Sequence, residues 1–288
     1  MGIKLSEVSF AYFVPKNKKK PIHFTLKNIN LNINSQDEFI AIAGHTGSGK
    51  STLVQLLNAL NLPTKGEIEI FGHIVKNKSK IKLKPIRKTV GLVFQFPEYQ
   101  IFEETVLKDI MFGPKNFGAS DPETVAREAA EIMGITDLLE RSPFNLSGGQ
   151  MRKVAIAGIL ASKPEVLILD EPTAGLDPLA KDEFLTFLKK INDEYHKSII
   201  IITHDMDTVS KYAKRVLVLK EGELMYDGSK TELFKNEKII SECNLDYPEI
   251  VKVMKGLKEK LKVDFDEYQY TVEDAFKELK RVFGVAHE

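Results

Sequence analysis

The sequence contains a single cysteine, Cys243, and no tryptophan among its 288 residues. One cysteine cannot form a disulfide within the chain, and this scarcity is typical of a protein from a reducing compartment. Basic and acidic side chains number 41 each. The chain therefore lacks the basic excess that is usual in a dedicated nucleic-acid binder, and we expect no nucleic-acid partner.

Long hydrophobic runs are also missing. No apolar stretch approaches the roughly 20 residues that are needed to cross a bilayer, and the first residues lack the charged-then-apolar plan of a signal peptide. We expect a soluble protein that reaches the cytoplasmic face of the cell membrane only through a partner. The composition, 43% hydrophobic and 28% charged, and the length fit one large α/β domain with a small appendage.

Three short apolar runs are each followed directly by polar residues. The runs are residues 39–43, 166–169 and 199–202. Continuous apolar strands with polar C-terminal ends are typical of a parallel sheet that is covered on both faces. Ligands of such sheets bind beyond the carboxyl ends of the strands, so we expect the functional site there.

The other segments predict three further parts. Alternating patterns at 5–12, 26–33 and 67–71 predict antiparallel strands with one solvent-facing side, and residues from about 103 to 163 predict helices. Beyond residue 235 two apolar stripes recur at helical spacing, Ile250-Met254-Leu257-Leu261 and Val272-Phe276-Leu279-Phe283. Thr271 is the predicted cap of the second helix. Two interpretations of this tail remain open: a helical unit that packs on itself, or a contact with another subunit.

A glycine-rich segment that fits G-x-x-x-x-G-K-[ST] follows the first apolar strand and opens a helix. It consists of Gly44, His45, Thr46, Gly47, Ser48, Gly49, Lys50 and Ser51, followed by Thr52. Glycines allow successive backbone N–H groups to face a phosphate, and the helix N-terminus adds positive potential. We predict that these residues bind ATP, with Lys50 reaching the β- and γ-phosphates and the Ser51 hydroxyl binding Mg²⁺. A chance glycine turn would not combine this strand, this helix and the acidic motif described next.

Two carboxylates end the second apolar strand. A carboxylate at the end of a buried strand is costly without a partner, and Mg²⁺ is the predicted partner of Asp170. Glu171 lies one residue further out, where it can polarise an attacking water as a general base. Its alternative role is a simple ion pair with a lysine.

The pentapeptide Leu146-Ser147-Gly148-Gly149-Gln150 precedes a helix that we expect to begin near Met151. Two glycines and a serine before a helix predict a second anion site. The one nucleotide of this chain is already expected to bind at Lys50. The second anion site, formed by Ser147, Gly148, Gly149 and Gln150, is therefore expected to close on the nucleotide of another subunit.

In this order the motifs resemble the ATP-binding subunits of ABC transporters, from residue 1 to about 235. The resemblance implies that LSGGQ is the family signature and that Gln95 is the glutamine near the metal and the γ-phosphate. It also implies that Asp177 lies in the D-loop, that His204 is the switch histidine, and that Tyr12 stacks on adenine. Phe13 is an alternative to Tyr12. Catalysis is thereby assigned to Glu171, His204 and Gln95, and the metal to Ser51, Gln95 and Asp170.

Residues 93–102, 112–114 and 154–158 resemble, more narrowly, the ATPases of energy-coupling factor and cobalt-type importers, and the segment 171–177 resembles the second ATPase of that pair. These importers take up vitamins or transition-metal ions. The resemblance implies three partners: a second ATPase subunit, as a heterodimer or homodimer, a transmembrane scaffold and a substrate-binding membrane protein. The tail 236–288 resembles a region that holds the ATPase pair together.

The expected fold is a P-loop α/β core with an antiparallel β subdomain, a helical subdomain over about 97–163 and a short C-terminal helical domain. Alternatives are an ATPase of another ABC transporter, a soluble ABC ATPase in repair or translation, and a nucleotide-sensing module without turnover. Repair proteins have a long coiled coil between the residues that correspond to Lys50 and the signature, and this chain has none there. Translation factors usually have two nucleotide domains in one chain, and this chain has one. Glu171 and His204 argue against the sensing module.

Overall fold

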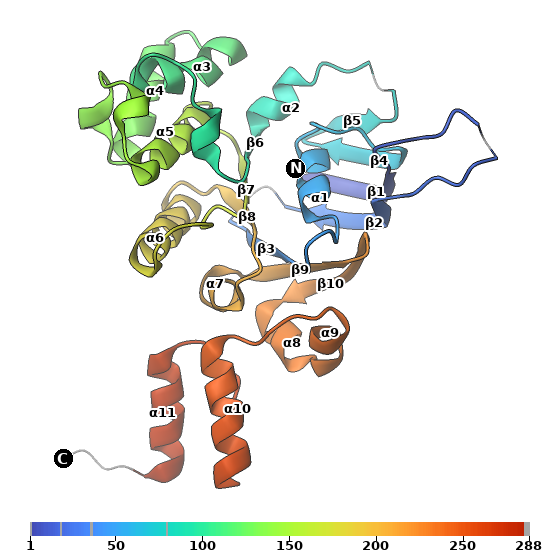
Figure 1. Ribbon diagram of the computed structural model, residues 1–288, viewed down its shortest axis with the longest axis vertical. Coiled ribbons are helices and arrows are strands. Elements are labelled where there is room, and N and C mark those ends of the chain that lie inside the picture. The colour runs from blue at the N-terminus through green and yellow to red at the C-terminus, as the bar shows by residue number, and fades with distance from the viewer. Residues whose placement is uncertain (1, 18, 35–36, 79, 285–288) are drawn as a thin grey trace.

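Two β-sheets and three groups of helices make up the computed structural model, which describes residues 2–17, 19–34, 37–78 and 80–284 (Figure 1). The larger sheet has six strands in the order β10-β9-β3-β8-β7-β6, and the smaller has four in the order β2-β1-β4-β5. In the part of the chain that is described, no helix is both long and apolar enough to cross a membrane. The predicted α/β class is confirmed.

Five of the six strands of the large sheet run parallel, and β10 is antiparallel to β9. Their bounds are β3 Phe39–Ala43, β6 Val90–Val93, β7 Val166–Asp170, β8 Ser198–Ile202, β9 Arg215–Lys220 and β10 Glu223–Ser229. All of β3, β6 and β8 is buried. Runs without alternation arise because helices or the second sheet cover both faces.

The two faces of this sheet carry different layers. On one face Ile40, Ile42 and Ile168 pack with α1 (Lys50–Leu57) and with the small sheet. On the other face Phe39 and Leu167 pack with α6 (Pro178–Glu194), α7 (Met206–Tyr212) and the helical subdomain. Helix α1 and the helical subdomain therefore lie on opposite sides of the sheet.

The small sheet is antiparallel throughout. Its strands are β1 Ile3–Phe10, β2 Leu26–Ile33, β4 Lys65–Ile70 and β5 His73–Lys76. In β2 the buried residues are interrupted by exposed ones, as the alternating pattern predicts. The short helix α2 (Lys84–Thr89) leads from this sheet into β6.

The helical subdomain begins with the 3₁₀ turn η1 (Pro97–Gln100) and contains α3 (Val106–Phe117), α4 (Pro122–Ile132) and α5 (Gly148–Leu160). Two further 3₁₀ turns, η2 (Thr136–Leu138) and η3 (Pro143–Asn145), connect α4 to α5. Helix α5 starts at Gly148, three residues before the expected Met151, because Ser147 caps the helix. Both signature glycines are therefore helical residues.

The C-terminal region has two parts. Helices α8 (Lys230–Lys235) and α9 (Glu237–Glu242) add Phe234, Ile240 and Cys243 to the main core. Helices α10 (Glu249–Leu261) and α11 (Val272–Phe283) form a hairpin that projects from the body (Figure 1) and has a small core of its own around Met254 and Phe265. The separate unit thus begins near residue 248.

The apolar stripe expected on α11 is only partly covered. Leu279 packs into the small core, but Val272, Phe276 and Phe283 are 70%, 58% and 47% exposed. Of the two interpretations, packing within the tail accounts for Leu279 but not for these three residues, because α11 places its small residue Ala275 between the helices.

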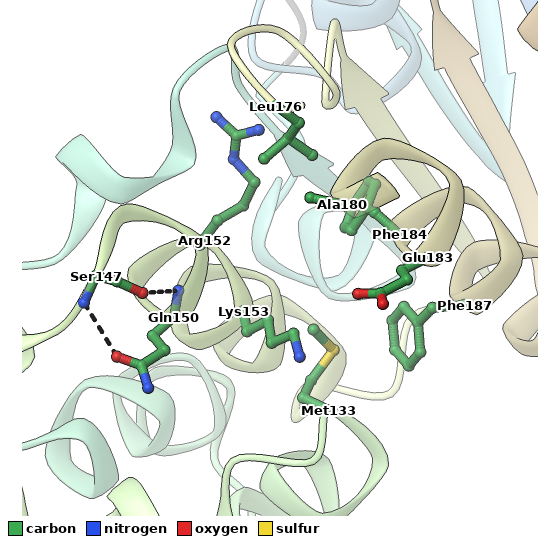
Figure 2. Close-up of a pocket in the computed structure, with 11 residues that line it drawn as sticks. Met133, Ser147, Gln150, Arg152, Lys153, Leu176, Ala180, Glu183, Phe184 and Phe187 are labelled. Atoms are coloured by element: carbon green, nitrogen blue, oxygen red, sulfur yellow. Dashed lines mark hydrogen bonds between the residues drawn. The ribbon is translucent and has the colours of Figure 1, made fainter. Parts of the chain in front are cut away.

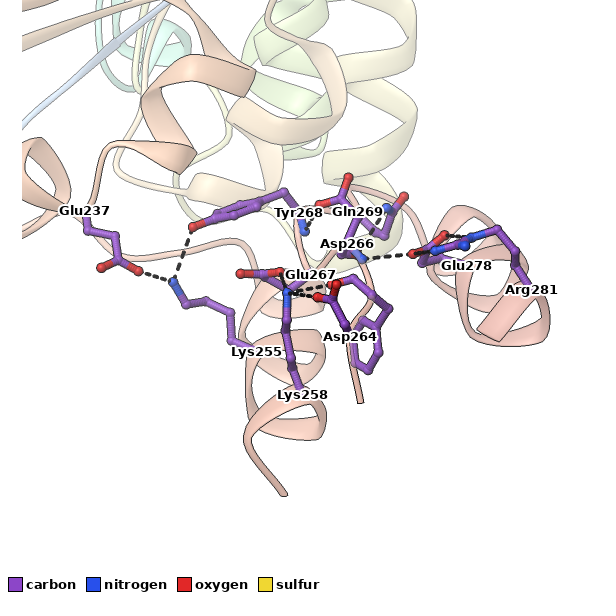
Figure 3. Close-up of polar contacts among 11 residues, drawn as sticks. Glu237, Lys255, Lys258, Asp264, Asp266, Glu267, Tyr268, Gln269, Glu278 and Arg281 are labelled. Carbon is purple, nitrogen blue, oxygen red and sulfur yellow. Dashed lines mark hydrogen bonds and ion pairs between the residues drawn. The ribbon is translucent and has the colours of Figure 1, made fainter. Parts of the chain in front are cut away.

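Polar contacts fix the chain between α10 and α11 (Figure 3). Lys258 Nζ donates to Glu267 Oε2 and to the Phe265 carbonyl, at 2.7 Å each. Lys255 pairs with Glu237 of α9 at 2.7 Å, and its ammonium also lies over the Tyr268 ring. The Lys258 contacts fix the chain within the hairpin, and the Lys255–Glu237 pair joins the hairpin to the body.

Candidate nucleotide site

Four neighbouring strands bring the predicted site residues together. Strands β3, β8, β7 and β6 are adjacent and parallel, so their carboxyl ends lie along one edge of the sheet. The glycine-rich loop follows β3, His204 follows β8, Glu171 follows β7 and Gln95 follows β6. The residues predicted for the site therefore lie beyond the carboxyl ends of the strands, where ligands of parallel sheets bind.

The glycine-rich loop has the backbone shape that needs glycine. Gly44, Gly47 and Gly49 have φ values of 139°, 81° and 104°, a region that favours glycine. A Cβ on Gly44 would lie 2.2 Å from the carbonyl oxygen of Leu219. The loop ends directly at α1, so its N–H groups and the helix N-terminus face the same space.

The Lys50 side chain is folded back over this loop. Its Nζ donates to the carbonyl oxygens of Gly44 at 2.7 Å and His45 at 2.9 Å. Burial lowers the pKa of Lys50, while the nearby charges of Glu171 and Asp170 act in the opposite direction. A buried ammonium with only carbonyl partners is suited to receive the negative charge of a phosphate.

Donors and carboxylates near Lys50 fit a magnesium–phosphate group. The Ser48 Oγ is buried and has no hydrogen-bond partner among the described residues, which leaves it free for a phosphate oxygen. Ser51 donates to Asp170, whose pKa is raised mainly by burial and lowered in part by this hydrogen bond. A hydroxyl beside a buried carboxylate is the hard oxygen set that Mg²⁺ prefers.

Glu171 lies at the centre of the three predicted catalytic residues. Gln95 Nε2 donates to Glu171 Oε2 at 3.3 Å, and His204 Nδ1 lies 3.6 Å from Glu171 Oε1. Glu171 has a φ of 45°, which is uncommon for a residue with a side chain. His204 is 78% exposed at its side chain. The structure thus joins Gln95, Glu171 and His204 at one point of the open edge.

Tyr12 lies beside the P-loop helix. Its hydroxyl is 3.0 Å from Thr52 Oγ1 and 3.5 Å from Gln55 Oε1, and the residue is 65% exposed. Phe13 is 74% exposed and has no such link in the described contacts. Of the two candidates for stacking on adenine, Tyr12 is the one that is fixed to α1.

The signature forms a capped helix start. Ser147 Oγ accepts from the Gln150 N–H at 3.3 Å, and the Gln150 side chain accepts from the Ser147 N–H at 3.0 Å. Nothing lies within 4 Å of a Cβ built on Gly148 or Gly149. Because α5 and α1 lie on opposite faces of the sheet, the structure does not bring Ser147 to Lys50 of the same chain.

Asp177 is the cap of α6, where it accepts from the Ala180 N–H at 2.9 Å.

A cavity of about 330 Å³ lies between the signature helix and α6 (Figure 2). Gln150, Arg152 and Lys153 line it from α5, and Glu183 and Phe187 line it from α6. Arg152 was not among the residues expected at the site. Gln150 and Lys153 lie close to it in the sequence, so the local pattern gives no clue that Arg152 is buried.

A second missed residue is Lys181 of α6. Its Nζ donates to Asp205 Oδ2 at 2.6 Å, and Asp205 follows the predicted switch histidine and caps α7. The pair therefore joins the helix after the D-loop to the loop that carries His204. Sequence separation alone gives no indication of such a contact.

The comparisons with known proteins agree with this geometry. The profile of the family described as "ABC transporter" matches residues 26–174. The chain is 47% identical, over 98% of its length and 97% of the relative's, to the energy-coupling factor transporter ATP-binding protein EcfA2 of Caldanaerobacter subterraneus. It is also 47% identical to the protein of that name from Bacillus subtilis, over 90% and 95% of the two chains.

Solved structures are similar as well. The structure titled cbiO1 from Clostridium perfringens, part of the ABC transporter complex cbiONQ, has a TM-score of 0.72 and 36% identity, over 88% of this chain and 98% of that one. The dimeric ATP-binding cassette MJ0796 bound to ADP and Pi has a TM-score of 0.68 and 30% identity, over 79% and 98%.

The chain therefore belongs to the ABC transporter family, in which it is an ATP-binding and ATP-hydrolysing subunit. Within this family, the predicted resemblance to the ATPases of energy-coupling factor transporters is confirmed by relatives that match almost the whole chain.

Proposed function

We propose that this chain is one of the two ATPases of an energy-coupling factor importer of vitamins or transition-metal ions, bound at the cytoplasmic face of the cell membrane. The observation that carries the proposal is near-full-length identity of 47% to ATP-binding proteins of such transporters. The match covers 98% of this chain, so it includes most of the tail. A transmembrane scaffold and a substrate-binding membrane protein are the proposed membrane partners.

The proposed mechanism uses the residues at the sheet edge. The loop N–H groups, Ser48 and Lys50 would hold the phosphates of ATP, and Tyr12 would stack on its base. Ser51, Gln95 and Asp170 would hold Mg²⁺, which neutralises phosphate charge when it is bound. Glu171 would accept a proton from the attacking water, with His204 beside it.

Two subunits are proposed to meet head to tail. Helices α5 and α1, which Ser147 and Lys50 begin, pack on opposite faces of the sheet, so each ATP would lie between Lys50 of one subunit and the signature of the other. The open space around Gly148 and Gly149 supports this arrangement, since an approaching phosphate meets no side chain there. The exposed Val272, Phe276 and Phe283 of α11 are proposed as a second contact between the paired subunits.

The segment 94–102 is the proposed dock for a helix of the membrane partner. Tyr99 is 85% and Phe102 is 56% exposed, and the Phe102 ring packs against Phe112 of α3 at 4.8 Å between centroids. Exposed aromatic residues on a rigid turn suit an amphipathic helix. Ile101 is a further large apolar residue of this segment, for which the sequence alone favours a place in the dock; it is only 7% exposed and belongs to the core, so it does not line the dock.

A reconstitution experiment tests the proposal. The full chain would be purified together with the membrane proteins that copurify with it, and uptake would be measured in vesicles with a panel of vitamins and divalent metal ions. Tyr99→Asp should reduce uptake at least tenfold and leave ATP binding intact. Tyr195→Asp, which changes an exposed tyrosine at the end of α6, is the matched control. Normal uptake by the Tyr99 variant would refute the dock, and a chain isolated without membrane proteins would refute the transport role.

A further inference from the structure

A buried arginine connects three motifs of this chain. Arg152 lies in the first turns of α5, two residues after the signature, and its side chain is 7% exposed. The guanidinium Nε and Nη2 donate to the two carboxylate oxygens of Glu98 in η1, at 3.4 and 3.3 Å. Nη1 donates to the carbonyl of Pro172 at 3.0 Å, and Nη2 also donates to that of Ala174 at 3.1 Å.

The two carbonyls lie immediately after the proposed base. Pro172 follows Glu171 directly, and the Ala174 N–H donates back to the Glu171 carbonyl at 3.1 Å, so the segment forms a tight turn. Glu171 has the unusual φ of 45° in this turn. Such a conformation persists only where surrounding contacts stabilise it. The Arg152 guanidinium supplies two of these contacts, its hydrogen bonds to the Pro172 and Ala174 carbonyls.

The Arg152 guanidinium also binds Glu98, which lies in the proposed dock. Glu98 lies in the middle of the segment 94–102, next to the exposed Tyr99, while its own side chain is only 15% exposed. Gln95, at the start of the same segment, donates to the Glu171 carboxylate. The segment is therefore linked to Glu171 in two ways: directly through Gln95, and indirectly through Glu98 and Arg152, which hold the turn that follows Glu171.

We propose that Arg152 is a positioning residue, which orients the Glu171 carboxylate through the turn 172–174 and transmits displacement of η1 to it. The transmission part rests on the proposed docking of a membrane helix on the segment 94–102. A buried, hydrogen-bonded charge pair has one preferred geometry, so a shift of Glu98 moves the guanidinium and with it both carbonyls. A lysine at position 152 keeps the charge but cannot reach three acceptors with fixed directions.

Steady-state and single-turnover hydrolysis of radiolabelled ATP by the purified complex test the positioning role. Arg152→Lys should lower kcat by about tenfold or more, with the KM for ATP changed less than about twofold, since only the base is misplaced. Arg127→Lys, which alters an exposed arginine paired with Glu123 on α4, is the matched control and should behave as wild type.

A double variant separates positioning from a structural role. If Arg152 acts through Glu171, adding Arg152→Lys to Glu171→Gln should cost less than about twofold in the single-turnover rate, because the base is already absent. The inference would be overturned if the rate losses of the two single variants multiply in the double variant. It would also be overturned if Arg152→Lys has the same kcat as Arg127→Lys, or if its rate falls only in proportion to its thermal stability.

Glu98→Gln tests the transmission. The measured quantity is the ratio of ATP turnover in the complete membrane complex to turnover in the ATPase pair alone, and we expect this ratio to fall at least threefold. An unchanged ratio would overturn the transmission part. Normal uptake by Tyr99→Asp in the same complex would instead refute the dock itself and would leave the kinetic result for Arg152 standing.

Discussion

Replacing Ile101 or Tyr99 by alanine should produce opposite effects, although the two residues lie two positions apart. Ile101 is 7% exposed and packs in the main core, whereas Tyr99 is 85% exposed. Truncating a buried isoleucine to alanine costs about 2–5 kcal/mol, because transferred surface is lost and a cavity remains. The residual exposure of Ile101 places its expected cost near the middle of this range, at about 3 kcal/mol. Tyr99→Ala should change the free energy of unfolding by less than about 0.5 kcal/mol.

Urea denaturation followed by circular dichroism measures both effects. With a slope of about 3 kcal/mol per molar urea, Ile101→Ala should lower the midpoint by about 1 M, and Tyr99→Ala should leave it unchanged. Uptake in vesicles should show the reverse order, with Tyr99→Ala impaired and Ile101→Ala active below its melting temperature. A midpoint lowered equally by both variants would refute the division of this segment into a core residue and a docking residue.

Three other predictions concern the nucleotide site and the tail. Lys50→Ala should weaken ATP binding by about 10–100-fold in calorimetric titration, since a charge-assisted contact to phosphate is lost, and unchanged affinity would refute the P-loop assignment. Burial raises the pKa of Asp170, so its charge destabilises the folded protein at pH 7; Asp170→Asn should therefore raise the urea midpoint without nucleotide, and this gain should shrink as the pH falls. Phe276→Asp should loosen the subunit pair in sedimentation while the urea midpoint stays within experimental error, and an equally tight pair would exclude α11 from the contact.

Much of the architecture follows from the sequence because local patterns report burial directly. Strands β3, β7 and β8 were predicted from continuous apolar runs, and β2 from alternation between Leu26 and Ile33. The proximity of the predicted site residues also follows from the sequence, because they follow the carboxyl ends of parallel strands, where topology alone brings them together.

Other features of the fold and the site depend on contacts between segments that are distant in the sequence. The hydrophobic periodicity of one segment does not predict such contacts. The burial of Ile101 and the exposure of Tyr99 depend on how η1 lies against α5. The residues next to them in the sequence do not show which of the two side chains is buried. Arg152 was missed for the same reason, since its acceptors come from residues 98 and 172–174. On α11 the stripe left open whether its face packs within the tail or on another subunit, and only the structure shows that α10 packs against the small residue Ala275 instead.

The empty space around Gly148 and Gly149 has a genetic consequence. A methyl group on either glycine meets no atom of its own chain, and alanine is the better helix former, so such a variant should fold and express as well as wild type. If the subunits pair head to tail as proposed above, its defect would arise only when a second subunit brings a nucleotide to that surface. In a cell that makes both normal and altered copies, the altered ones would survive quality control, compete for the same assemblies and disable one of the two composite sites in each. A recessive-looking change at a signature glycine would then behave as a dominant one.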